Sequence, residues 1–282
     1  TCLVLMLNML ERYDLKALGR FSPETLHRMA EVMRRAYLER ARHLGDPDFE
    51  PIPEHLTSKD YAAKLVESIS PDRATPSESL APDLLRDSEG SDTTHFSVID
   101  ASGLAVANTY TLEHSYGSRV MVKNAGFLLN NEMGDFNWFP GKTDRQGRIG
   151  TKPNLIQPGK RMLSSQCPTI VRKDGKTVLI TGSPGGRTII NTVLCILVNV
   201  IDFDMPLREA VDAPRMHHQW FPDRIDLEKE GVPESVVPAL ERFGHRVRYH
   251  RQGDAHSIAV DVKSGQFIGI ADRRIMGSAG AP

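Results

Sequence analysis

The stretch that decides the fold is Asp92-Thr93-Thr94-His95-Phe96-Ser97-Val98-Ile99-Asp100. It follows residues 70–92, which are rich in proline, serine and acidic side chains and are typical of an exposed connector. From residue 93 onward the side chains alternate as in a β-strand. Residues 104–111 supply a second strand after a turn at residues 100–103. The pattern therefore predicts a β-hairpin that begins abruptly behind a polar linker.

Thr93 has the features of an N-terminal nucleophile. Cleavage of the Asp92–Thr93 bond would place a free α-amine on the residue that carries the attacking hydroxyl, so one residue would supply both nucleophile and base. An α-amine with a pKa of about 7.7–8.0 is well matched to accept that proton near neutrality. His95 shares a strand face with Thr93, but the amine is nearer. We therefore expect autocleavage between Asp92 and Thr93.

Size and composition exclude several classes of protein. The chain has 282 residues, a formal net charge of −1 and a mean hydropathy of −0.33. No basic cluster favours nucleic acid, and no apolar run is long enough to span a bilayer. Cys2, Cys167 and Cys195 are odd in number and lack metal-ligand spacing, so they predict neither a disulfide framework nor a metal site. We expect no cofactor.

The segments on either side of the linker have different periodicities. Residues 1–69 predict helices, with one start at Ser22-Pro23-Glu24 and another near Thr57. Residues 168–181 and 257–271 predict hairpins, while residues 188–201 and 233–243 predict helices. Strands interrupted by helices indicate a layered α+β core.

Three further motifs carry groups that suit an anion or a cation. Gly185-Gly186 lies between an apolar strand and an apolar helix, where bare backbone N–H groups can approach a ligand or simply form a tight turn. Glu132 and Asp135 follow an apolar strand and could hold an ammonium group or lie in a solvated turn. Ser164-Ser165 offers two hydroxyls, or ordinary loop polarity.

Taken in order, these motifs resemble the γ-glutamyltranspeptidase (glutathione hydrolase) family over essentially the whole chain. The matching strings are TTHFS at 93–97, YTLE at 110–113, NNEMGDF at 130–136, SS at 164–165, GSPGG at 182–186 and APRMHHQW at 213–220. The resemblance implies a four-layer αββα sandwich of the N-terminal-nucleophile hydrolase type, made by autocatalytic cleavage of one precursor. Residues 1–92 would be the C-terminal part of the large subunit, and residues 93–282 the small subunit that carries the nucleophile.

The resemblance also implies roles for individual residues. Catalysis would use Thr93 as nucleophile, Thr111 as the hydroxyl that assists it, and the amides of Gly185 and Gly186 as the oxyanion hole. Binding of the α-amino and α-carboxylate groups of the substrate would use Glu113, Glu132, Asp135, Ser164 and Ser165. The acids suit a cation, and the hydroxyl and backbone donors suit anions.

The implied activity is γ-glutamyl transfer from glutathione and related amides to water, amino acids or peptides, through an ester on Thr93. Its partners would be these small molecules and the other subunit of a heterodimer, with no nucleic acid and no membrane span. The family resemblance suggests the periplasm or the cell exterior. Two alternatives are a related acylase acting on glutaryl side chains of cephalosporins, and an unprocessed, non-catalytic homologue.

The sequence departs from the family pattern in several places. Residue 113 is Glu where other members carry Asn, and residues 138–160, which match a lid, contain no tyrosine. The chain opens inside an apolar helix at Thr1, so we expect that it is a fragment. The missing part would hold an export signal and an arginine that binds the substrate carboxylate.

Overall fold

The computed structural model describes residues 1–82, 84, 93–261 and 264–281. Contacts between residues divide the chain into two compact units. The first unit comprises Thr1–Gly90, Glu132–Ser164 and Met216–His250, and the second comprises Ser91–Asn131, Ser165–Arg215 and Arg251–Pro282. The predicted boundary between residues 92 and 93 is a site of chain cleavage. The division into compact units does not test it, so it stays a prediction.

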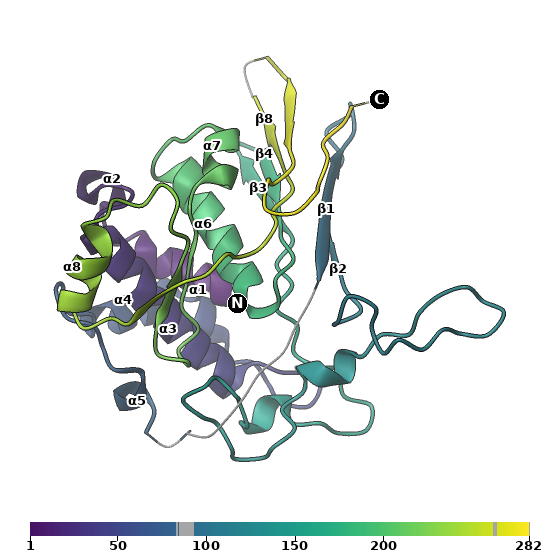
Figure 1. Cartoon of the computed structure of the whole chain (residues 1–282), viewed down its shortest axis with the longest axis horizontal. Helices are drawn as coiled ribbons and strands as arrows, with labels where there is room; N and C mark the ends of the chain where they lie inside the picture. The colour runs from purple at the N-terminus through teal and green to yellow at the C-terminus, as the bar shows by residue number, and fades with distance from the viewer. Residues whose placement is uncertain (83, 85–92, 262–263, 282) are drawn as a thin grey trace. The chain divides into compact units, whose positions relative to one another are not determined.

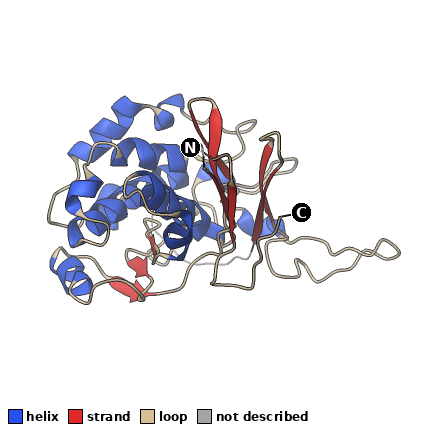
Figure 2. Cartoon of the chain, turned by 90° about the horizontal axis from the view of Figure 1, so that it is seen from above, coloured by secondary structure: helices blue, strands red, loops and turns tan. Residues whose placement is uncertain are grey.

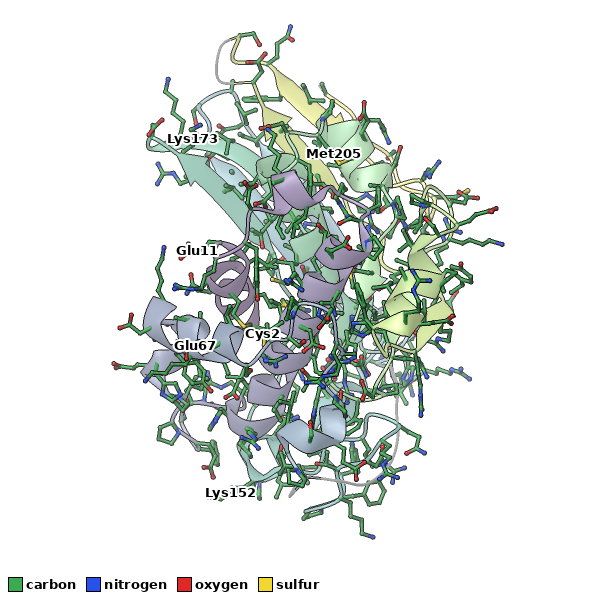
Figure 3. The ribbon with its side chains drawn as sticks, turned by 90° about the vertical axis from the view of Figure 1, so that its left-hand side faces the viewer. Cys2, Glu11, Glu67, Lys152, Lys173 and Met205 are labelled. Carbon is green, nitrogen blue, oxygen red and sulfur yellow. The ribbon has the colours of Figure 1, made fainter. Side chains whose placement is uncertain are left out.

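Helices dominate the N-terminal part of the first unit. Helix α1 (Cys2–Leu10) packs against α3 (Pro23–His43) and α4 (Lys59–Glu67), and Figure 3 labels Cys2 and Glu11 at the two ends of α1. The predicted start of α3 is confirmed, since the hydroxyl of Ser22 accepts the backbone N–H of Thr25 at 3.1 Å. The predicted start near Thr57 is confirmed to within one residue: Ser58 caps α4, and its hydroxyl accepts the backbone N–H of Tyr61.

The remaining elements of the first unit are short. They are α2 (Leu15–Leu18), η1 (Glu54–Thr57), α5 (Ser77–Leu80), η2 (Glu132–Asp135), η3 (Lys152–Asn154) and α8 (Val236–Arg242). Strands β5 (Met216–His217), β6 (Ile225–Leu227) and β7 (Val247–Tyr249) form a mixed sheet in which β6 and β7 are parallel. Helix α3 contacts both α8 and β5, and it is buried along most of its length, so it is the centre of this unit's core.

The second unit contains two sheets that lie against each other. Strands β1 (Thr94–Ile99) and β2 (Ala105–Tyr110) form the predicted hairpin. Strands β3 (Thr169–Lys173), β4 (Lys176–Thr181), β8 (Ser257–Val260) and β9 (Phe267–Ile270) form an antiparallel sheet in the order β3-β4-β8-β9, which confirms the other two predicted hairpins. β1 contacts β4 and β8, and β2 contacts β3 and β4.

Helices cover the other face of the four-stranded sheet (Figures 1 and 2). Helix α7 (Leu207–Asp212) contacts β8 and β9, and α6 (Ile189–Ile201) packs on α7. Helix, sheet and sheet thus follow one another as three layers, and the predicted α+β class is confirmed. No helix in the described part of the chain is long and apolar enough to cross a membrane.

Candidate active site

Thr93 and Thr111 lie opposite each other at the open end of the β1–β2 hairpin. Its last pair is Thr94 with Tyr110, so the register continued by one residue places Thr93 opposite Thr111. Their side-chain oxygens are 3.4 Å apart, with Thr93 as donor. The local fold thus brings together the predicted nucleophile and the hydroxyl expected to assist it. Asp92, the other side of the predicted cleavage site, lies outside the described residues.

The turn after β2 fixes the hydroxyl of Thr111. Its Oγ1 accepts the backbone N–H of Glu113 at 2.8 Å. Glu113 is buried and has a φ of 73°, a left-handed conformation that a non-glycine residue rarely adopts. Such a conformation costs of the order of 1–3 kcal/mol and persists where the surrounding structure holds it. The strained turn at Glu113 therefore holds the Thr111 hydroxyl beside the start of β1, where Thr93 lies.

His95 is a buried neutral ring on the same side of β1 as Thr93. Ser97 donates its hydroxyl to the carbonyl of His256 at 2.9 Å, so its oxygen accepts from Nε2–H of His95 at 3.1 Å. Nδ1 of His95 then accepts the hydroxyl of Thr109 at 2.9 Å. Burial, with His256 nearby, lowers the pKa of His95 to about 4. Both ring nitrogens already form hydrogen bonds within the protein, so His95 stabilises the local structure and is not placed to take the hydroxyl proton of Thr93.

His95 also explains the first glycine of the glycine-rich loop. A Cβ on Gly182 would lie 2.1 Å from Cε1 of His95, so no larger residue fits. The strand of the predicted nucleophile therefore touches the loop that carries the predicted oxyanion hole. Sequence reasoning missed this contact, because a strand residue and a distant glycine give no shared local signal.

Gly185 and Gly186 lie between β4 and α6 with φ values of 126° and 53°. Thr188 donates both its backbone N–H, at 3.0 Å, and its hydroxyl, at 2.8 Å, to the carbonyl of Gly185. No acceptor among the described residues takes a hydrogen bond from the backbone N–H of Gly185 or Gly186. These amides precede a helix of 13 residues, where backbone donors and the helix dipole favour an anion.

The predicted cation-binding acids and the first serine belong to the first unit. Glu132 and Asp135 bound the single turn η2, and both are partly exposed. The buried amide of Asn154 joins this turn to the serine segment. Its Nδ2 donates to the carbonyl of Asp135 at 2.6 Å, and its Oδ1 accepts the backbone N–H of Leu163 at 2.9 Å. Asn154 thus fixes the acidic turn relative to the residue before Ser164.

The segment before the serine pair is anchored a second time. Arg161 donates its backbone N–H at 2.8 Å and its Nε at 3.0 Å to Oδ2 of the buried Asp46. Ser164 is exposed, whereas Ser165 is partly buried and belongs to the second unit. Sequence reasoning found the serines but missed Asn154 and Asp46, whose contacts span many residues of chain.

One buried group has the composition of a metal site. Ligand atoms of His27, Glu31 and His245 lie within 4.8 Å of one another. The carboxylate of Glu31, however, accepts four donors: Arg34, Arg35, and the backbone N–H and hydroxyl of Thr75. Four acceptor sites is the usual capacity of a carboxylate, so none remains for a cation. The arrangement favours a structural ion cluster over a metal centre.

Comparison with known proteins identifies the family. The family model described as gamma-glutamyltranspeptidase matches residues 1–281. The chain belongs to the γ-glutamyltranspeptidase family. It is 43% identical over 274 residues to the glutathione hydrolase proenzyme of Escherichia coli, covering 96% of this chain and 47% of that protein. It therefore spans about half the length of the curated relatives that it matches.

Solved structures give the same family and fold. A mutant γ-glutamyltranspeptidase from Helicobacter pylori is 46% identical, with a TM-score of 0.61 over 64% of this chain and 100% of that one. The cephalosporin acylase from Bacillus halodurans has a TM-score of 0.79 over 97% of this chain and 47% of that one. Its 21% identity makes it a match of fold alone. The expected N-terminal-nucleophile hydrolase relationship is confirmed.

Proposed function

We propose that this chain carries the nucleophile of an enzyme that transfers γ-glutamyl groups from glutathione and related amides to water, amino acids or peptides. The observation that supports this best is the pairing of the Thr93 and Thr111 hydroxyls at 3.4 Å. The same unit holds the two backbone amides at Gly185 and Gly186 whose N–H groups have no acceptor in the described chain. A nucleophile and an oxyanion hole are the two parts that acyl transfer requires.

The reaction proceeds in two acyl-transfer steps after the Asp92–Thr93 bond has been cut. Oγ of Thr93 attacks the γ-carbonyl carbon, and the α-amine of Thr93 takes the hydroxyl proton. The amide N–H groups of Gly185 and Gly186 stabilise the oxyanion. When the intermediate collapses, the carbon–nitrogen bond breaks and the leaving amine receives that proton. Water or an acceptor amine then attacks the ester and gives a proton to the α-amine, which passes it to Oγ of Thr93 as the ester carbon–oxygen bond breaks and the γ-glutamyl product leaves.

Recognition of the glutamyl group rests on the remaining predicted residues. Glu132 and Asp135 bind the α-ammonium group, the hydroxyls of Ser164 and Ser165 bind the α-carboxylate, and Glu113 contributes to the same recognition. A glutaryl group has no ammonium and would leave the acids unpaired. This argues against the acylase alternative. The mature enzyme is a heterodimer cut from one precursor, working in the periplasm or outside the cell.

Replacement of Thr93 by alanine in the full-length precursor tests this proposal. We expect mass spectrometry to find one uncut chain and an assay for glutamate release from glutathione to find no activity. Thr94→Ala is the matched control, because Thr94 is exposed and points to the other side of β1. The Thr94→Ala precursor should be cut between Asp92 and Thr93 into two fragments. Cutting and glutamate release in the Thr93 variant would refute the proposal, and an uncut, inactive wild-type precursor would favour the non-catalytic alternative.

A pair of substrates tests the recognition step separately. The processed enzyme is given γ-glutamyl and glutaryl anilides, which differ by the α-ammonium group. We expect the ratio of the two kcat/KM values to be at least about 100 and to fall about tenfold or more in Asp135→Asn, since the charge that meets the ammonium is lost. Equal kcat/KM values for both anilides would identify an acylase instead.

A further inference from the structure

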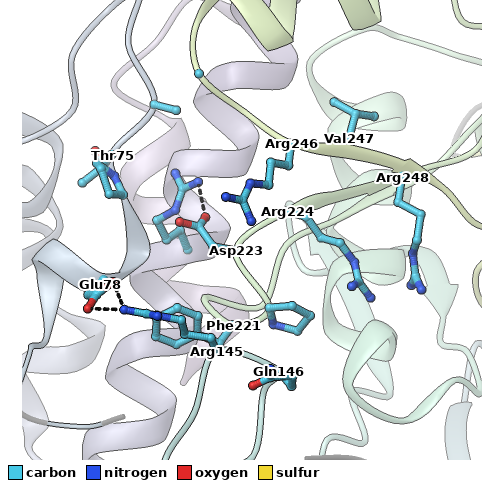
Figure 4. A pocket seen from close by; sticks show the side chains of 15 residues that line it. Thr75, Glu78, Arg145, Gln146, Phe221, Asp223, Arg224, Arg246, Val247 and Arg248 are labelled. Carbon is cyan, nitrogen blue, oxygen red and sulfur yellow. Dashed lines mark hydrogen bonds and ion pairs between the residues drawn. The ribbon is translucent and has the colours of Figure 1, made fainter. Parts of the chain in front are cut away.

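The first unit contains a cavity of about 1060 Å³ whose walls are rich in arginine (Figure 4). Five arginines and two carboxylates line it, contributed by α3, the α5 region, the segment around residue 145, and the starts of β6 and β7. The arginines are Arg34, Arg145, Arg224, Arg246 and Arg248, and the carboxylates are Glu78 and Asp223. Protein pockets that bind small molecules commonly measure about 300–1,000 Å³, so this cavity is large enough for a small ligand.

Two of these arginines are neutralised by neighbouring carboxylates. Arg34 is buried and pairs with Glu31 and, at 3.0 Å, with Asp223. Arg145 pairs with Glu78 at 2.7 Å, and both side chains are well exposed. Burial raises the pKa of Asp223, but His218 and Arg34 outweigh it and hold that pKa well below its usual range. This side of the cavity is therefore electrically balanced.

The opposite side carries an excess of positive charge. β6 and β7 are parallel with Asp226 opposite Arg248, so the register places Arg224 opposite Arg246 on the same face. Arg224 and Arg248 both bind Asp226, at 3.0 and 2.7 Å. Arg224 and Arg248 thus share one carboxylate, while Arg246, one register pair away, binds no carboxylate among the described residues. Figure 4 shows Arg246 reaching from the start of β7 toward Asp223.

Donors on this face remain available to a ligand. Arg224 bonds Asp226 through Nε, and neither of its Nη atoms has an acceptor in the described chain. The exposed guanidinium of Arg246 has no hydrogen-bond or ion-pair partner among the described residues. Planar guanidinium groups match the oxygens of phosphate and carboxylate by paired hydrogen bonds.

We propose that this cavity binds a small anion of the phosphate class, held by Arg224 and Arg246 on the β6–β7 face. A phosphate-class ligand with two anionic groups, such as pyrophosphate, fits better than a single carboxylate, because Figure 4 shows the guanidinium groups of Arg224 and Arg246 directed to different parts of the cavity. The site is built from first-unit residues and is independent of the catalytic residues proposed above.

Calorimetric titration of the full-length processed enzyme with inorganic pyrophosphate, at constant ionic strength, tests the site. We expect saturable binding whose dissociation constant rises about tenfold or more in Arg246→Ala and in Arg224→Ala, equivalent to about 1.4 kcal/mol or more. Arg246→Lys should fall between wild type and alanine, since it keeps the charge but loses the planar pair of donors. Unfolding temperature, measured on each variant, confirms that the protein is folded.

Arg242→Ala is the matched control. Arg242 is an exposed arginine at the end of α8 in the same unit, and it does not line the cavity. Its dissociation constant should stay within about twofold of wild type. Three outcomes would overturn the proposal: no saturable binding beyond that of chloride, equal affinity in Arg246→Ala and wild type, or citrate binding more tightly than pyrophosphate.

Discussion

A buried carboxylate of the first unit and two backbone amides of the second unit have opposite hydrogen-bonding environments. In the first unit, each oxygen of the Glu31 carboxylate accepts two donors, and burial leaves no room for water around it. In the second unit, the N–H groups of Gly185 and Gly186 have no acceptor in the described chain. Only the Glu31 carboxylate is therefore compensated by partners within the described chain.

The difference separates residues that stabilise the fold from residues kept ready for a ligand. A buried polar group gains stability when every partner is present and loses it when one is removed. Donors without a partner are instead a cost in the free enzyme that a bound anion removes. Substitutions in the first set should therefore lower the free energy of unfolding, whereas substitutions in the second should lower the rate of catalysis.

The largest effect on stability is expected for Glu31→Gln. The substitution keeps the shape of the side chain but leaves Arg35 buried without its anion, and Arg34 with Asp223 as its one remaining anion. Breaking a buried pair in this way costs about 3–5 kcal/mol of unfolding free energy. Chemical denaturation of the purified enzyme measures it. The matched control is Lys59→Ala, which breaks an exposed pair with Glu11 and should cost at most about 1 kcal/mol. Equal losses in both variants would contradict the comparison.

A smaller effect, and one on catalysis, is expected for Gly185→Ala. A Cβ there would lie 2.5 Å from Oγ1 of Thr188, so the loop must shift and its amides move away from the oxyanion. Loss of one oxyanion donor costs about 2.7–4 kcal/mol of transition-state stabilisation, or about 10² to 10³ in kcat. Steady-state kinetics on a γ-glutamyl anilide measure it.

Gly175→Ala controls for backbone strain at this site. Gly175 has a φ of 77°, and an added Cβ would meet no atom within 4 Å. The variant carries the strain of a left-handed alanine, about 1–2 kcal/mol, without disturbing the candidate oxyanion hole. Its kcat should match wild type. A comparable fall in kcat in both variants would assign the effect to strain.

Local patterns predicted the elements that place the nucleophile, because each depends on neighbours in sequence. The hairpin of β1 and β2 follows from alternation and the turn at Asp100, whose carboxylate accepts the backbone N–H groups of Ser102 and Leu104. Once the turn is fixed, residue 93 must lie opposite residue 111. The exact cap of α4, Ser58 and not Thr57, could not be predicted, because serine and threonine are both good helix caps.

Contacts between distant segments could not be predicted in the same way. Arg34 meets Asp223 across 189 residues of chain, and Asn154 joins two loops that carry predicted site residues. The sequence around Arg34 and around Asn154 does not distinguish these side chains from ones that point into solvent. The arginine excess beside β6 likewise depends on the parallel register with β7, which requires the fold.

Buried histidines in both units should make the free energy of unfolding depend on pH. Burial is the main cause that lowers the pKa of His245 to about 3 and of His218 and His95 to about 4. In the unfolded chain these rings take up protons below about pH 6.5, so between the two pKa values the unfolded state binds more protons. Stability present above pH 6.5 is therefore lost as the pH falls, by up to about 2 kcal/mol per histidine at pH 5.

Substitution identifies which unit this acid sensitivity comes from. In the wild type, Nδ1 of His27 accepts Nε2–H of His245 at 2.8 Å. The side-chain amide of Gln in His245→Gln can still donate to that nitrogen, but it takes up no proton in this pH range. The slope of unfolding free energy against pH between 5 and 6.5 should fall by roughly a quarter to a third, since burial also lowers the pKa of His27, which contributes beside these three rings. His250→Gln, at an exposed position, should leave that slope unchanged. If His95→Gln alone removed the whole slope, the sensitivity would belong to the second unit, and the first unit's network would not be the acid-labile part of the fold.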